Sequence, residues 1–376
     1  ASIRQPHSKP IRLPDDFERL IHHRGIEIPE PPLRFAGKTQ PSSTDTLPLR
    51  GLAAKGPFDQ LLAPHTSDGP IQIAVICPRA EAPLLEQFLG ASSRIHKPAR
   101  GTREEYLVPY TGFESVYRVP ITFPTRDDPL WYTLPEVDSR LDEREGALDM
   151  SRKIRDGIST LAAAGRPVFL ILTPDRWRHW RAYHNEQEEF DVHDFVKAYC
   201  VQRGIATQFL DEATLRYQDK CRVWWWLSVA VYAKAMRTPW VLDALDADTA
   251  FVGLGYAIDR QASKGKHIVL GCSHIYNAQG QGLQFRLRRV EDPIISGGNP
   301  FLSFQDARRL GETIRTLFWE SHLRLPGRVV IHKQTPFRRD EQHGIRVGLE
   351  GVRHLELVEI NFESALRYVS SQPTAS

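Results

Sequence analysis

Short apolar runs alternate with helical segments from residue 71 onward, and this alternation restricts the fold more than any other feature of the sequence. Residues 71–76, 167–172 and 206–210 have the length and apolar character of buried strands. Helical stretches at 82–89 and 192–203 separate them. A parallel pair of strands needs a long crossover, usually a helix, whereas antiparallel strands can be joined by a short turn. The pattern therefore predicts an α/β domain with a parallel, Rossmann-like sheet.

A different order of elements begins near residue 245. Three strand candidates follow one another there without a helix between them, and an amphipathic helix and two further strands come after. The three strands are expected at 251–258, 267–272 and 283–290, the helix at 304–322, and the later strands at 328–332 and 355–360. Three strands, a helix and then another strand is the order of an RNase H-like fold.

Length and composition indicate a globular protein of more than one domain. The chain has 376 residues and a hydrophobic content of 41%, which suits two separate cores. No apolar run approaches the roughly 20 residues that span a bilayer, and residues 1–14 lack the apolar core of a signal peptide. The four cysteines are widely spaced without a C-x2-C pair, which favours buried free thiols. A cytoplasmic protein without a membrane partner is therefore expected.

The longest helix candidate, residues 219–236, contains three consecutive tryptophans, Trp224 to Trp226. Their apolar neighbours favour a helix packing surface over a platform for stacking bases.

Charge is distributed unevenly along the chain. Residues 251–340 carry 14 Lys+Arg against 7 Asp+Glu, a balance of +7, whereas the whole chain has a formal net charge of +3. A basic second domain favours a polyanionic partner. Arg260, Lys264, Lys266 and Lys333 are candidates for a nucleic-acid channel there.

Four polar side chains of the first domain are expected to converge: His193, Lys197, Gln208 and Lys234. His193 and Lys197 are one turn apart on a predicted helix, and the strand that follows returns Gln208 beside them. Convergent donors without a carboxylate partner suit a phosphate better than a proton transfer. The alternative is a solvated helix face, which is what a His and a Lys four residues apart usually form.

The sequence around these residues resembles the MID domain of Argonaute proteins. H-x3-K is followed by G-I-x-T-Q from Gly204 and by K-x4-P-W-x-L from Lys234. The resemblance implies that His193, Lys197, Gln208 and Lys234 bind the 5′ phosphate of a guide strand, with His193 in place of a more usual tyrosine. It also suggests Mg2+ at that phosphate as the one cofactor.

The second domain resembles the PIWI domain of the same family, but its expected nuclease positions lack carboxylates. In active members the first strand ends in Gly-x-Asp, where this chain has G-L-G ending at Gly255. A later strand normally reads I-H-R-D, where this chain reads I-H-K-Q ending at Gln334. A two-metal site holds its ions about 4 Å apart with several carboxylates. The resemblance therefore implies a domain that binds nucleic acid without cutting it, and no catalytic residue is assigned.

Two alternatives stay open. An active metal-dependent nuclease could use displaced ligands such as Asp259, although four strand residues separate it from Gly255 by about 13 Å. The chain could instead be a nucleic-acid-binding scaffold that uses no guide. A dinucleotide fingerprint at Gly253 and Gly255 is disfavoured, because its third glycine is absent.

The resemblance covers residues 28 to about 360 and has the organisation of a short prokaryotic Argonaute. It predicts a proline-rich extended arm over residues 1–65, a MID domain over 66–244 and a PIWI domain over 245–376. Family members continue beyond the last strand candidate, so a PIWI domain truncated at its C-terminus is expected.

The same resemblance implies partners. The chain should bind a guide strand of RNA or DNA and a complementary target, expected to be DNA. In short Argonautes, target recognition activates an APAZ-containing effector protein, commonly with a TIR or sirtuin-like NAD-degrading domain, in defence against invading DNA. The expected protein is thus not itself an enzyme, and its output comes from that partner.

Overall fold

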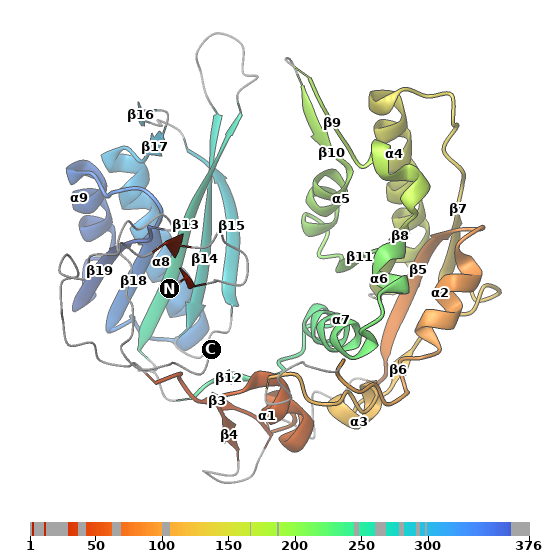
Figure 1. Ribbon diagram of the computed structural model, residues 1–376. Coiled ribbons are helices and arrows are strands. Elements are labelled where there is room, and N and C mark those ends of the chain that lie inside the picture. The colour runs from red at the N-terminus through yellow and green to blue at the C-terminus, as the bar shows by residue number, and fades with distance from the viewer. Residues whose placement is uncertain are drawn as a thin grey trace. The chain divides into compact units, whose positions relative to one another are not determined.

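The computed structural model describes residues 2–3, 11–12, 29–36, 43–61, 69–99, 106–165, 167–185, 188–243, 248–259, 268–277, 282–290, 294–297 and 299–361. Residues 1–31 form one compact unit, where β1 (Ser2–Ile3) and β2 (Ile11–Arg12) pair in antiparallel fashion. Residues 32–376 form the other unit, in which two five-stranded sheets are the main elements (Figure 1).

The first sheet is parallel, with the order β11, β8, β5, and with β6 and β7 pairing successive parts of β5. Ile73 and Val75 of β5 belong to one hydrophobic cluster, whereas Ala74 and Ile76 belong to another. Both faces of this strand are therefore buried, as is usual in parallel sheets. The strands are β5 (Ile71–Pro78), β6 (Ile121–Thr122), β7 (Trp131–Leu134), β8 (Val168–Thr173) and β11 (Thr207–Asp211).

Helices cover both faces of this sheet. The face of Ile73 packs against α2 and α7, and the opposite face packs against α4 and α5. Trp224 and Trp225 of α7 are buried in this packing, as expected, but Trp226 is 58% exposed. The Rossmann-like prediction is confirmed. The helices are α2 (Ala82–Leu89), α4 (Glu143–Leu161), α5 (Val192–Val201) and α7 (Lys220–Lys234).

The segment predicted as an extended arm, residues 1–65, is in part folded, which corrects that prediction. A helix, α1, covers Pro48–Lys55, and the side chains of Phe35, Leu49 and Leu52 are buried in the core of the first sheet. Proline in the first turn of a helix costs little, because its missing N–H would have no partner there. Nearby short strands are β3 (Leu33–Arg34), β4 (Thr44–Asp45) and β12 (Val241–Leu242), with β3 between the other two.

The second sheet has the order β15, β14, β13, β18, β19. β14 pairs in antiparallel fashion with both β15 and β13, whereas β13, β18 and β19 run parallel to one another. Val252 and Ile331 face a core that also contains Ile314 and Phe318 of α8. This arrangement confirms the RNase H-like prediction. The elements are β13 (Thr249–Asp259), β14 (Ile268–Asn277), β15 (Gly282–Arg289), α8 (Phe304–His322), β18 (Arg328–Lys333), α9 (Arg339–Gly348) and β19 (His354–Glu359).

Helix α9 was not predicted, because glycine forms much of its buried face. A Cβ atom at Gly344 would lie 2.4 Å from the carbonyl oxygen of Phe304, and one at Gly348 would lie 2.1 Å from that of Arg308. These glycines let α9 pack closely on α8. Ile345 and Val347 are the large apolar residues within α9, so the sequence offers few apolar positions from which to recognise this helix.

Shorter elements connect these parts, and the domain boundaries at residues 65 and 244 stay predictions. The short elements are η2 (Phe58–Leu61), α3 (Phe113–Tyr117), η3 (Ala162–Ala164), η4 (Asp175–Trp180), β9 (Ala182–His184), β10 (Glu189–Asp191), α6 (Glu212–Arg216), β16 (Ile294–Ser296) and β17 (Asn299–Phe301). Cys77, Cys200 and Cys221 are buried and free, as expected. None of the described helices combines the length and hydropathy needed to cross a bilayer.

Candidate nucleic-acid interface

Strand β11 is an edge strand of the first sheet, and helices α5 and α7 both contact it from opposite faces. Asp191 caps α5 by accepting a hydrogen bond from the backbone N–H of Asp194. Asp219 caps α7 in the same way. These caps determine where each helix begins, and α5 then carries Lys197 to the sheet edge while α7 ends there at Lys234.

Lys197 contacts the free side of the edge strand. The carbonyl of Ala206 accepts from Phe169 of β8, so the carbonyl of the next residue, Thr207, points away from β8. Lys197 Nζ donates to that oxygen and, at 2.8 Å, to Thr207 Oγ1. The ammonium group also lies 5.9 Å from the ring centre of Phe209.

Lys234 is held by the side chain of Gln208. Its Nζ donates to Gln208 Oε1, and Gln208 Nε2 donates to the carbonyl oxygen of Phe209 at 2.8 Å. The amide has two N–H donors and one oxygen, so its oxygen and one donor are used within the protein. In this arrangement Gln208 chiefly positions Lys234.

The two ammonium groups raise the local electrostatic potential. Burial, and next the charge of Lys197, lower the pKa of Lys234 to about 8. Burial also lowers the pKa of Lys197. Within the described part of the chain, neither lysine has a carboxylate partner within ion-pair distance. A bound anion would relieve both the repulsion and the cost of desolvation, so this arrangement favours an anionic ligand.

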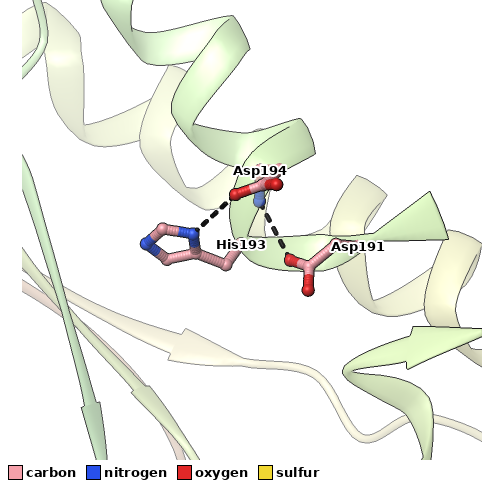
Figure 2. A group of neighbouring side chains, drawn as sticks. All are labelled: Asp191, His193 and Asp194. Atoms are coloured by element: carbon pink, nitrogen blue, oxygen red, sulfur yellow. Dashed lines mark hydrogen bonds and ion pairs between the residues drawn. The ribbon is translucent and has the colours of Figure 1, made fainter. Parts of the chain in front are cut away.

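His193 lies beside this pair but has an acidic neighbour. Its Nδ1 is 3.0 Å from Asp194 Oδ1, as Figure 2 shows, and its ring is 5.1 Å from that of Phe209. Phe209 therefore contacts both His193 and Lys197. Neither Phe209 nor Thr207 was singled out from the sequence, although Thr207 belongs to the G-I-x-T-Q motif.

Asp191, His193 and Asp194 form the one cluster of potential metal ligands that the described residues contain (Figure 2). All three are exposed, and Asp191 Oδ1 is used by the helix cap. Carboxylate oxygens suit Mg2+, but exposed acidic groups of this kind are common without an ion. Mg2+ at the phosphate pocket stays a prediction.

In the second sheet, the two expected nuclease positions follow one pair of residues on adjacent strands. Leu254 of β13 pairs with Lys333, the last residue of β18, so Gly255 follows this pair within β13 and Gln334 follows it directly after the end of β18. Both are exposed. A Cβ atom at Gly255 would meet no described atom within 4 Å, so packing does not require glycine there. The Asp259 side chain lies outside the described residues.

Lys333 is not a channel residue, which corrects that prediction. It is 2% exposed and donates to both carboxylate oxygens of Glu341 at 2.8 Å. Alternation along β18 places Lys333 on the same face as Val329 and Ile331, toward the core of α8 and α9. The other channel candidates, Arg260, Lys264 and Lys266, lie outside the described residues.

Solved structures with this arrangement of elements are Argonautes. The Argonaute of A. aeolicus is 15% identical with a TM-score of 0.54, covering 88% of this chain and 39% of that one. The Marinitoga piezophila Argonaute complex with a 5′-OH guide RNA is 10% identical with a TM-score of 0.52, covering 94% and 46%. The Clostridium butyricum Argonaute complex with a guide DNA and a 19-mer target DNA is 12% identical with a TM-score of 0.50, covering 83% and 36%.

These likenesses establish the fold. The chain has an Argonaute-like fold, with a Rossmann-like part followed by an RNase H-like part, as the sequence resemblance implied. It spans less than half the length of the three Argonautes. No protein-family model matches the sequence, and no curated protein does either.

Proposed function

We propose that this protein binds a guide strand by its 5′ phosphate and recognises a complementary nucleic acid. The observation that carries the proposal is the pair of half-buried lysines, Lys197 and Lys234, which meet at the edge of β11 without a described carboxylate partner. The Argonaute-like fold supports it, since two of the similar structures contain guide strands.

The test varies the chemical group at the 5′ end of the strand, because one of those similar structures contains a guide with a 5′-OH group. Affinity is measured for one strand with and without its 5′ phosphate. We expect wild type to prefer the phosphorylated strand. Lys197→Ala should reduce that preference by about 10- to 150-fold, because charged hydrogen bonds contribute about 1.5–3 kcal/mol. Arg203→Ala, an exposed cation at the end of the same helical segment, is the matched control. Equal preference in wild type and Lys197→Ala would refute the pocket.

The second part of the proposal is that the RNase H-like part binds without cutting. Gly255 and Gln334 each follow the last paired position of β13 and β18, Leu254 with Lys333, and both stand where the sequence resemblance expects carboxylates. Without those ligands a two-metal site loses most of its affinity for Mg2+. The protein would then report target binding through another chain, for which we propose an APAZ-containing effector with a TIR or sirtuin-like NAD-degrading domain, acting in defence against invading DNA.

The partner is tested by co-expression with an APAZ-containing effector that carries a TIR or sirtuin-like domain. We expect the two chains to copurify and the NAD-degrading activity to require guide and matched target. An effector that responds equally well after deletion of this chain would contradict the partner proposal and leave the guide pocket untouched.

A further inference from the structure

Lys197 and Lys234, which meet at the edge of β11, are called the lysine pocket below. The exposed side of α7 extends from Lys234 to further residues that this pocket does not use. Arg222, Trp226, Ala230 and Lys234 are four residues apart, so they form one continuous ridge on the helix surface. Lys234 is the pocket end of this ridge, and Arg222 is the opposite end. Trp226 lies between them with 58% of its surface exposed, which is unusual for so large an apolar side chain.

A surface hollow of about 500 Å³ lies at the Arg222 end of the ridge. Arg216 and Tyr217 line it together with Arg222, and Tyr217 is 49% exposed. Each arginine has an acidic neighbour: Arg216 is 3.2 Å from Glu212 and Arg222 is 3.8 Å from Asp219. A guanidinium has five N–H donors, so one such contact leaves donors for a phosphate.

We infer that a single-stranded nucleic acid whose 5′ end occupies the lysine pocket continues along this ridge, stacks one base on Trp226 and places a later phosphate at Arg222. This inference rests on the proposed guide pocket. An aromatic face between two cationic positions is the arrangement that binds single strands, because bases stack on the ring while the backbone contacts the charges. Because Ala230 has a small side chain, it does not obstruct a strand that runs along the helix surface from Lys234 to Trp226.

The spacing along the helix sets the length of strand that is needed. Lys234 is eight positions after Trp226 in the helix, which corresponds to a rise of about 12 Å along the helix axis. At about 3.4 Å per stacked nucleotide, this corresponds to about three or four nucleotides. A nucleoside 5′-monophosphate should therefore fill the pocket without reaching Trp226, whereas a hexanucleotide should reach it.

The experiment compares a nucleoside 5′-monophosphate with a 5′-phosphorylated hexanucleotide by isothermal titration calorimetry. We expect Trp226→Ala to lower hexanucleotide affinity about tenfold and to leave mononucleotide affinity unchanged. Trp226→Phe should restore most of the loss, because a phenyl ring still stacks. Trp319→Ala, which removes a tryptophan of similar exposure from α8, should have no effect.

An abasic site placed at each position of the hexanucleotide in turn then distinguishes stacking of one base on Trp226 from a non-specific loss of contact area. One abasic position, expected near the third or fourth nucleotide, should weaken wild type but not Trp226→Ala. If Trp226→Ala binds the hexanucleotide as tightly as wild type does, while the preference for a 5′ phosphate persists, the proposed path of the strand along the ridge is wrong. The lysine pocket would remain supported in that case. If the phosphate preference itself is absent, the proposed guide pocket fails instead.

Discussion

The pocket lysines show how a single side chain gains function from its surroundings. An exposed lysine binds anions weakly, because water already solvates its charge. Lys234 is half-buried, and its hydrogen bond to Gln208 holds the ammonium beside the edge strand. Burial and the nearby charge of Lys197 lower its pKa to about 8, so its charge changes close to physiological pH.

Guide affinity should therefore depend on pH in a defined direction. Lys234 is protonated below a pH of about 8 and loses its charge above it. Affinity for a 5′-phosphorylated strand should thus fall between pH 7 and pH 9.5, while affinity for the 5′-OH strand changes less. In Lys234→Arg the guanidinium stays charged over this range, so the phosphate-specific fall should be smaller. An identical pH profile for wild type and Lys234→Arg would contradict this assignment.

Gln208 is expected to act through Lys234, and two substitutions separate this role from direct phosphate binding. Gln208→Met removes the amide that accepts from the Lys234 ammonium and donates to the Phe209 carbonyl. Because the charge of Lys234 itself remains, we expect an indirect loss of about 1 kcal/mol, or roughly fivefold in affinity. Gln208→Glu places a carboxylate against Lys234, which should raise the pKa of the lysine and repel the phosphate, with a loss greater than tenfold. Calorimetric titration with a phosphorylated strand measures both. A loss in Gln208→Met larger than in Gln208→Glu would contradict the positioning role.

At the scale of elements, the end of β18 is anchored to α9 by a buried ion pair. Lys333 donates to Glu341, and Glu341 also accepts from the backbone N–H groups of Leu302 and Arg338. Burial lowers the pKa of Lys333 although the pair with Glu341 opposes the shift. This network ties the strand that ends beside Gln334 to the segments around it.

Breaking this pair on one side should be costly. Glu341→Gln would leave the Lys333 ammonium buried without a counter-charge, so the free energy of unfolding should fall by about 3–5 kcal/mol. The double variant Lys333→Met, Glu341→Leu removes both charges and should be less destabilised. Urea denaturation monitored by circular dichroism measures the difference. Equal stability of Glu341→Gln and wild type would mean that Glu341 does not neutralise Lys333.

At the scale of the whole molecule, an RNase H-like fold supports catalysis only where its strand ends carry metal ligands. Gly255 and Gln334, the residues that follow the paired Leu254 and Lys333, are not carboxylates. The fold alone therefore does not imply a nuclease.

We expect no cleavage of a guide-matched target by the purified protein with Mg2+ or Mn2+. Gly255→Asp with Gln334→Asp should fold, since space is open at Gly255, but should not cut, because a two-metal site tolerates little geometric error. Gel analysis of labelled target measures cutting, and thermal melting confirms folding. Metal-dependent cutting by wild type that Asp259→Ala abolishes would favour the displaced-ligand alternative.

Local periodicity in the sequence determined the main elements. The helices at 82–89 and 304–322 have the predicted bounds, because each depends on apolar spacing within one segment. The order of strands and helices was enough to predict both sheets. Helix α9 was missed, because its close packing through Gly344 and Gly348 depends on a partner helix that no local pattern reveals.

The tertiary structure alone decided which lysine side chains are free to bind an anion. Lys197, Lys234 and Lys333 look equivalent in the sequence, since a lysine is usually exposed. Only the packing of α9 against β18 brings Glu341 to Lys333 and removes it from solvent. Only the position of β11 at a sheet edge brings Lys197 and Lys234 together from opposite faces. The physical reason is that the free energy of a charge depends on its counter-charges and its access to water, and both are set by residues distant in the sequence.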